Sequence, residues 1–262
     1  TENTSLLFPE NDALTLGNPD NASTDISLPD HYLLVKPQYQ LSYNNAKGEA
    51  NWVAWHLDFN DLGTTPRCDC FSPDAQLPSS FYKASASSYS GSGFDRGHQV
   101  PSSQRNNNIT NNAATFLMTN MLPQAPNLNQ ITWNDLESYC TSLANNGYEL
   151  YTYSGGYGSG GSGSNGSITY TISGTPVVVP SHCWKVVLIL PNGTNDISRI
   201  TSSTRVIAVA MPNVQSVNTQ PWGNYRISVD TLESLTGFDF LSSLSTTLQA
   251  QLEISVDNGP VN

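Results

Sequence analysis

Residues 93–99 combine side chains that are suited to phosphate chemistry. They include a carboxylate at Asp95, a permanent positive charge at Arg96 and a titratable imidazole at His98. An Arg can bind a phosphate through two hydrogen bonds, and a His is the side chain best placed to move a proton near neutral pH. Gly97 lets the backbone pass close to another group, or adopt a conformation that a side chain would forbid. This motif indicates a catalytic site only if the chain also supplies a metal ligand, a second cation and a fold that holds them in place.

Four further polar residues could complete such a site. Arg67 precedes the motif, Asn120 ends an apolar run, Asn129 opens a predicted helix and Glu137 lies two turns into it. Phosphodiester cleavage needs a nucleophilic water, a base to deprotonate it and cations on the developing phosphorane. Mg²⁺ prefers oxygen ligands and keeps most of its waters, so one Asn carbonyl and waters held by a Glu would bind it. The set therefore indicates metal-assisted cleavage of a phosphodiester.

The order and spacing of these residues resemble the DNA/RNA non-specific endonuclease family, the secreted ββα-metal (His-Me finger) nucleases. The resemblance covers roughly residues 31–245. It rests on Asp-Arg-Gly-His at 95–98, Thr-Asn-Met-x-Pro-Gln at 119–124, Leu-Asn-Gln at 128–130, Trp133, Leu-Glu at 136–137, Val-Pro-Ser-His-Cys-Trp-Lys at 179–185 and Ser-Leu-Thr-Gly-Phe-Asp at 234–239.

The resemblance implies how the substrate is attacked. His98 is the general base that activates water, Arg67 is the transition-state cation, and Arg96 is a phosphate contact. Asp95 is a structural partner of a neighbouring Arg and neither a catalyst nor a metal ligand. The expected activity is sequence-non-specific hydrolysis of DNA and RNA, leaving 5′-phosphates.

The resemblance also implies one divalent ion, Mg²⁺ or Mn²⁺. Asn129 is its one direct protein ligand, Glu137 binds it through water, and Asn120 fixes the site through hydrogen bonds. Many relatives carry a basic residue one helical turn after the Glu, where this chain has Thr141. That departure puts in doubt how the charge of Glu137 is balanced.

Two other functions remain open at this point. A secreted nucleic-acid- or glycan-binding module could use the same scaffold, although a binder has no reason to keep His98, Asn129 and Glu137 together. A narrower phosphodiesterase that acts on nucleotides or sugar phosphates would use the same chemistry.

Composition narrows the partners and the compartment. The net charge is −11 with ten Lys and Arg, so binding to nucleic acid must rely on a local cluster and a cation. Only 12% of residues are charged, which suits a secreted or periplasmic protein. No apolar run approaches the roughly 20 residues that span a bilayer, so we expect no membrane insertion.

The four cysteines offer a second indication of the compartment. Because neighbours two apart rarely pair, we expect Cys68 and Cys70 each to bond to Cys140 or Cys183. Zinc is the weaker interpretation, since this spacing is not a usual ligand pattern. Two bridges would indicate an oxidising compartment.

The apolar pattern predicts the elements that position the site. It indicates strands at residues 32–35, 39–43, 52–57, 114–119, 148–153, 168–172, 177–179, 184–190 and 206–211. Residues 131–145 form a helix with Trp133, Leu136, Cys140 and Leu143 on one face, and residues 229–248 form two short helical pieces. The Gly/Ser-rich residues 154–167 are a flexible loop.

Together with the resemblance, this pattern predicts an α+β fold. A central antiparallel β-sheet is flanked by helices and carries the ββα-metal site. Residues 1–30 form an N-terminal arm, and residues 31–262 form a single nuclease domain.

Overall fold

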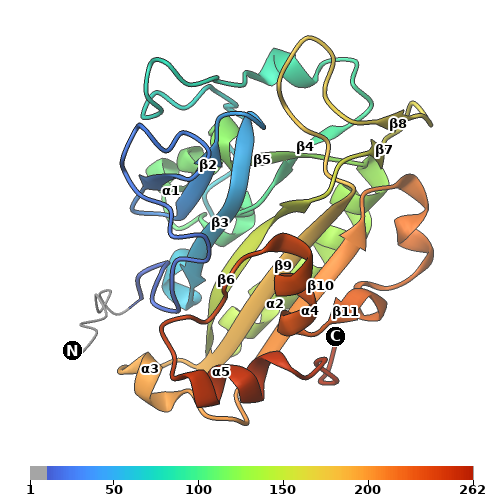
Figure 1. The fold of residues 1–262 in the computed structure, drawn as a ribbon. Helices are drawn as coiled ribbons and strands as arrows, with labels where there is room; N and C mark the ends of the chain where they lie inside the picture. Colours follow the sequence, from blue (N-terminus) through green and yellow to red (C-terminus); the bar gives the residue numbers. More distant parts are fainter. Residues whose placement is uncertain (1–10, 262) are drawn as a thin grey trace.

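A seven-stranded antiparallel sheet forms the centre of the computed structural model, which describes residues 11–261 (Figure 1). The first ten residues of the predicted arm lie outside this range. The strands run in the order β1-β2-β3-β6-β9-β10-β11. Their bounds are β1 Tyr32–Val35, β2 Gln40–Asn44, β3 Glu49–Leu57, β6 Tyr148–Tyr157, β9 His182–Pro191, β10 Arg205–Pro212 and β11 Arg226–Ile227. The predicted α+β class with a central antiparallel sheet is confirmed.

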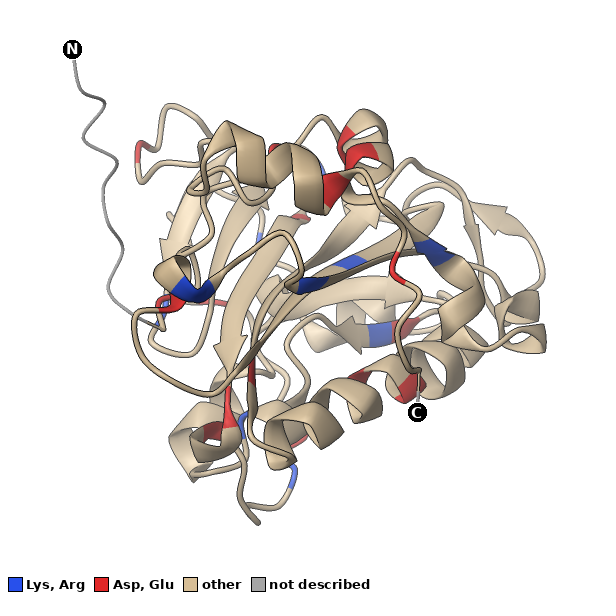
Figure 2. Ribbon diagram, turned by 90° about the horizontal axis from the view of Figure 1, so that it is seen from below, with Lys and Arg blue, Asp and Glu red and all other residues tan. Residues whose placement is uncertain are grey.

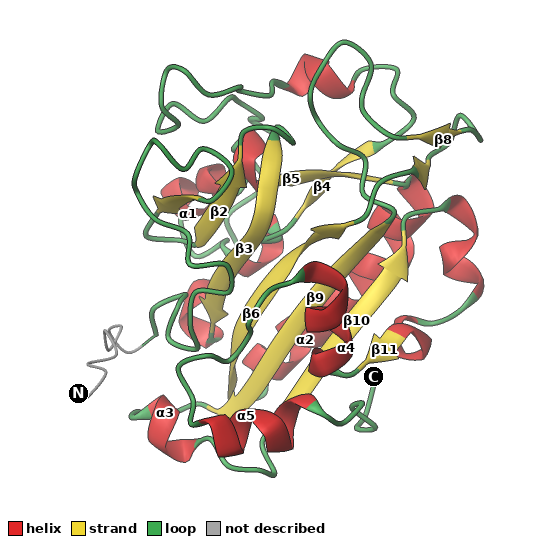
Figure 3. Ribbon diagram, in the orientation of Figure 1, coloured by secondary structure: helices red, strands yellow, loops and turns green. Residues whose placement is uncertain are grey.

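Helices cover both faces of this sheet (Figures 1 and 3). α2 (Asn134–Asn145) lies behind the sheet in these views, and α4 (Val229–Thr236) and α5 (Thr246–Glu253) lie in front. Apart from short 3-10 turns, the remaining elements are the strand pairs β4 (Asp95–His98) with β5 (Met121–Gln124) and β7 (Gly161–Ser162) with β8 (Ile168–Thr169), the helices α1 (Ile109–Ala114) and α3 (Asp196–Arg199), and a π-helix, Leu128–Trp133.

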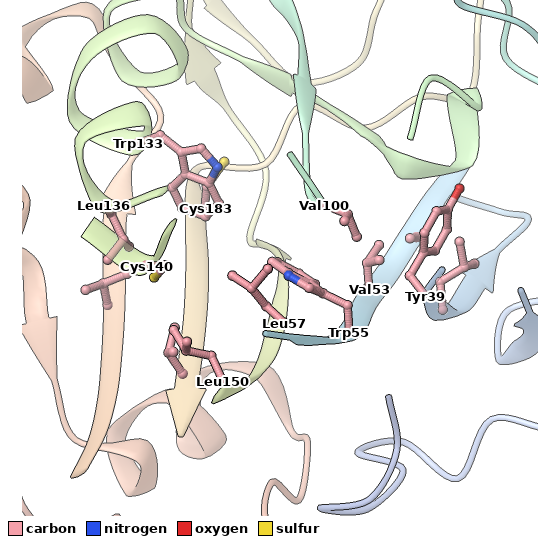
Figure 4. Close-up of a cluster of buried hydrophobic side chains, with 14 of the residues drawn as sticks. Tyr39, Val53, Trp55, Leu57, Val100, Trp133, Leu136, Cys140, Leu150 and Cys183 are labelled. Carbon is pink, nitrogen blue, oxygen red and sulfur yellow. The ribbon is translucent and has the colours of Figure 1, made fainter. Parts of the chain in front are cut away.

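Successive side chains of a strand point to opposite faces, so each central strand contributes side chains to the two hydrophobic cores on either side of the sheet. In β9, Trp184 packs with the α4 and α5 side, whereas Val187 packs with the α2 side. Figure 4 shows the second of these cores, where Trp133 and Leu136 from the helical side approach Trp55 and Leu150 of the sheet. The two cores hold the sheet rigidly between its helices.

Several predicted elements differ in the structure. The helix predicted from residue 131 becomes α-helical only at Asn134, because the preceding turn is a π-helix. The predicted strand at 114–119 is wrong: α1 ends at Ala114, and a strand begins only at Met121. That strand contains Pro123, which is tolerated because β5 pairs with β4 alone.

The Gly/Ser-rich segment is partly a strand and not wholly a flexible loop. β6 continues through residue 157. A Cβ on Gly155 would lie 2.7 Å from the Trp184 ring, so glycine is required for the sheet to pack there. The later pieces 168–172 and 177–179 form only the two-residue β8 and an isolated bridge between Thr171 and Val178.

The predicted cysteine pairing is wrong. Cys68 and Cys70 bond to each other with their Cα atoms 5.1 Å apart. Cys140 on α2 and Cys183 on β9 are free thiols buried in the core of Figure 4. The three-residue bridge is possible because Asp69 adopts a positive φ of 50°, which brings its two neighbours together.

The few Lys and Arg residues are spread over the chain, on strands, in loops and, at Arg199, on α3 (Figure 2). No helix within residues 11–261 is long and apolar enough to cross a membrane.

Candidate active site

The β4–β5 pair, the π-helix and α2 follow one another as a ββα unit, and this unit carries most of the predicted site residues. The register places Gly97 opposite Leu122 and His98 opposite Met121. A Cβ on Gly97 would lie 2.0 Å from the Gln124 side chain, so the strands approach this closely only with glycine at that position. The close approach predicted for Gly97 is confirmed.

His98 ends β4 inside an aromatic enclosure. Its ring lies edge-on to Phe71 and Phe116, with ring centroids 5.7 and 4.9 Å away. The side chain is 8% exposed, and its Nε2 has no hydrogen-bond partner among residues 11–261. Burial, followed by the positive charge of Arg67, lowers the pKa of His98 to about 3. The imidazole is therefore neutral near pH 7, with one buried nitrogen uncommitted.

Arg67 lies beside the Phe116 ring and directly precedes the Cys68–Cys70 disulfide. Its guanidinium carbon is 4.8 Å from the Phe116 ring centroid. Arg67 Nε donates to Asp69 Oδ1 at 2.6 Å, and Nη1 donates to Ser102 Oγ at 3.1 Å. The side chain is 49% exposed, so the guanidinium remains open to a solvent-borne anion.

A cleft of about 590 Å³ brings Arg67 and Arg96 together with Asn129, the predicted direct metal ligand. Arg96 lies over the Phe71 ring at 4.0 Å, which fixes one face of its guanidinium. The residues that line the cleft are Arg67, Asp69, Phe71, Ala86, Ser87, Tyr89, Ser90, Phe94, Asp95, Arg96 and Asn129. Phosphate is the anion that two Arg side chains in such a cleft would bind.

Asn129 is oriented by Asp95. Its Nδ2 donates to Asp95 Oδ2 at 2.8 Å, and Gln130 Nε2 donates to the same oxygen at 2.7 Å. Because the amide nitrogen is bound to a carboxylate, the carbonyl oxygen of Asn129 points away from it. The expected Arg partner of Asp95 is wrong: the partners are these two amides.

Glu137 lies beside a lysine that the sequence analysis did not assign. Lys185 Nζ, from β9, is 3.4 Å from Glu137 Oε1 and 4.5 Å from the Trp133 ring centroid. Burial raises the pKa of Glu137 to about 7, and Lys185 opposes that rise. Thr141, in place of the basic residue expected one turn later, donates to the backbone carbonyl of Glu137. The cation that balances Glu137 thus comes from the sheet.

Asn120 lies behind the site, with its amide fully bonded to backbone. Its Oδ1 accepts from the Val100 nitrogen at 3.0 Å, and its Nδ2 donates to the carbonyls of Val100 and Thr115. Its own carbonyl accepts from the nitrogen of Gln99, the residue after His98. Asn120 therefore fixes the chain that follows His98 and has no side-chain group left for a ligand.

A divalent metal fits the donors that the site presents. The Asn129 carbonyl is a hard oxygen ligand with a fixed orientation, and Glu137 is a carboxylate with a cation on one oxygen. A second group that could hold a metal, His56, Glu149 and Asp196, is buried elsewhere in the fold.

Sequence reasoning missed the residues that support this site. Lys185 closes the predicted run at 179–185, yet nothing in that run indicates that it contacts Glu137. Phe71, Ser102 and Asp69 also escaped prediction, because they contact His98 and Arg67 only through the folding of irregular loops.

The ββα unit, the buried imidazole and the two-arginine cleft define a metal-dependent phosphodiesterase of the ββα type. The chain belongs to the DNA/RNA non-specific endonuclease family, whose model matches residues 18–247. It is a phosphodiester hydrolase that cleaves DNA and RNA without sequence specificity, and the family is metal-dependent.

Individual relatives agree with this assignment. A nuclease of Nostoc sp. strain PCC 7120 is 49% identical over 94% of this chain and 86% of its own length. Nuclease C1 of Cunninghamella echinulata var. echinulata is 31% identical over 84% of this chain and 86% of its own length. The crystal structure of EndoG in complex with EndoGI shares the fold, with a TM-score of 0.72 and 23% identity over 89% of this chain and 91% of that one.

Proposed function

We propose that this nuclease uses His98 as the general base and one Mg²⁺ or Mn²⁺ ion held by Asn129 and, through water, by Glu137. The observation that carries this proposal is the buried, unpartnered Nε2 of His98 beside the arginine cleft. Its depressed pKa keeps the nitrogen unprotonated and able to accept a proton at neutral pH. When bound, the metal would supply positive charge to the phosphate and the leaving oxygen.

The protein side chains would act in one displacement. His98 Nε2 takes a proton from water as the water oxygen bonds to phosphorus and the P–O3′ bond breaks. The departing 3′ oxygen takes its proton from solvent water. Arg67 stabilises the negative charge that develops on the phosphate oxygens, and Arg96 holds the phosphate in the cleft. Asn120 acts on His98 through the backbone that it fixes. This cleavage leaves a 5′-phosphate and a 3′-hydroxyl.

We also infer that the mature protein works outside the cytoplasm and that residues 31–262 form one nuclease domain. The Cys68–Cys70 bridge and the low charge content support an oxidising compartment. Leu14 and Leu16, in the described part of the predicted arm, are fully buried in the core on the α4 and α5 side, so this part packs into that domain.

Plasmid DNA and total RNA test the proposal when they are incubated with Mg²⁺, with Mn²⁺ and with EDTA. We expect both polymers to be cut with either ion and neither with EDTA. Fragments that are 5′-labelled by polynucleotide kinase only after phosphatase treatment would carry 5′-phosphates. Labelling without phosphatase would refute the stated bond cleavage, and cutting in EDTA would refute the metal requirement.

A further inference from the structure

A buried group of three ligating side chains lies on the face of the sheet opposite Glu137. His56 is on β3, Glu149 is on β6, and Asp196 begins α3. Their ligand atoms lie within 4.8 Å of one another, and the residues are 7%, 0% and 2% exposed. Their neighbours Trp55 and Leu150 pack on the α2 side, so the alternation of strand side chains places this group on the other side.

Two atoms of this group face each other without hydrogen bonds. His56 Nε2 and Glu149 Oε2 are 3.4 Å apart, and neither has a hydrogen-bond partner within residues 11–261. Leaving buried polar atoms unpaired is costly. Zinc binds His nitrogen and carboxylate oxygen at about 2.0–2.2 Å, so two ligands at a tetrahedral angle lie roughly 3.3 Å apart. The observed separation matches one edge of such a site.

Neighbouring side chains hold both carboxylates in place from outside. Arg199 Nη2 pairs with Glu149 Oε1 and with Asp196 Oδ1, and the Tyr151 hydroxyl donates to Asp196 Oδ2. These contacts use both oxygens of Asp196 and Oε1 of Glu149, whereas Oε2 of Glu149 has no hydrogen-bond partner within residues 11–261. Such outer hydrogen bonds orient ligating carboxylates.

Charge and access also suit a cation. The carboxylates of Glu149, Asp196, Asp58 and Asp61 exceed the charges of Arg199 and Arg105 by two, which one divalent ion would neutralise. His56 and Asp58 also line a cleft of about 720 Å³, which gives a path to the imidazole.

We propose that His56, Glu149 and Asp196 form a second, structural metal site for a divalent transition metal such as Zn²⁺. One imidazole with two carboxylates is a zinc-type ligand set, unlike the all-oxygen set at Asn129 and Glu137. The ion would join β3, β6 and α3. It takes no part in the proposed hydrolysis.

Zinc and cobalt binding to the EDTA-treated, dialysed Asn129→Ala protein test this proposal, because that variant lacks the direct ligand of the catalytic ion. We expect one equivalent of Zn²⁺ by calorimetry, a tetrahedral absorption spectrum with Co²⁺, and a Tm that rises with Zn²⁺ concentration. His56→Gln in the same background should weaken zinc binding about 10-fold or more. His182→Gln removes a strand histidine outside the group and should leave binding unchanged.

Binding of less than one zinc in the Asn129→Ala background would overturn the proposal. Equal zinc affinity in His56→Gln would overturn it as well. Retained Mg²⁺-dependent cleavage by the His56→Gln protein that keeps Asn129 would show that this substitution leaves the fold intact. Failure of zinc binding would leave the proposed hydrolysis unaffected.

Discussion

Lys185 and Glu137 form a buried ion pair that links the central sheet to α2. Lys185 Nζ lies 3.4 Å from Glu137 Oε1 and is held over the rings of Trp133 and Trp55, at 4.5 and 5.3 Å. The lysine side chain is 1% exposed. Removing one member of a buried pair leaves the other charge uncompensated, which is far more costly than losing a surface pair.

Lys185→Met should therefore raise the Mg²⁺ concentration that the nuclease needs for cleavage near neutral pH. Without the lysine, the pKa of Glu137 rises above about 7, so more of the carboxyl is protonated at pH 7 and holds metal less well. Each unit of pKa shift would raise the Mg²⁺ requirement at pH 7 about 10-fold. Cleavage rates titrated with Mg²⁺ from pH 6 to 9 measure this, and the defect should shrink as pH rises. Lys185→Arg keeps the charge and serves as the control; a defect independent of pH would contradict this role.

Asp95→Ala should weaken metal binding through Asn129. The Asn129 amide loses the acceptor that fixes its orientation, and loss of such an outer contact typically costs 10- to 100-fold in metal affinity. Mn²⁺ binding, followed by paramagnetic relaxation of water protons, measures the change. Gln130→Ala removes the other donor to the same carboxylate and leaves Asn129 bound, so it should bind Mn²⁺ almost normally. Equal losses in both variants would show that Asp95 acts only on the general stability of the loop.

Asp69→Asn should improve substrate binding. Asp69 holds Arg67 Nε at 2.6 Å, and an incoming phosphate competes with it for the guanidinium. Both side chains are exposed, so relief of this competition should lower KM by no more than about fivefold, with kcat little changed. Steady-state cleavage of a short oligonucleotide separates the two constants. A raised KM would indicate that Asp69 positions Arg67 for the substrate.

Reducing the Cys68–Cys70 bridge should affect activity more than stability. The bridge closes a loop with one intervening residue, so it removes little entropy from the unfolded chain. It does restrain the segment that presents Arg67, and displacing a catalytic group by about 1 Å can cost up to 100-fold. The Cys68→Ser and Cys70→Ser double variant should keep its Tm and lose cleavage rate. An unchanged rate would show that Asp69, Ser102 and Phe116 place Arg67 without the bridge.

The sequence predicted the site best where its residues lie on one continuous unit. Asp95 to His98 and Asn129 to Glu137 fall on neighbouring strands and the following helix, so their spacing was enough to bring them together. Lys185 could not be assigned in the same way. It meets Glu137 across 48 residues and two layers of the fold, and no local pattern records such a contact.

The incorrect predictions arose where tertiary contacts override local preference. Residues 114–119 are apolar enough for a strand, but Asn120 binds the backbone of Val100 and Thr115 and so holds this segment in an irregular path. The predicted pairing of Cys68 and Cys70 with Cys140 and Cys183 rested on the rarity of disulfides between cysteines two residues apart. It could not anticipate the positive φ of Asp69, which makes the Cys68–Cys70 bond possible.

Chemical rescue of His98→Ala tests the proposed general base most directly. The substitution leaves space between Phe71 and Phe116 where free imidazole can bind. We predict a loss of about 10²- to 10⁴-fold in the cleavage rate at saturating Mg²⁺, with partial recovery as neutral imidazole is added. His182→Ala should lose little and gain nothing from imidazole. A His98→Ala protein that cleaves at the wild-type rate without imidazole would contradict the role of His98 as the base.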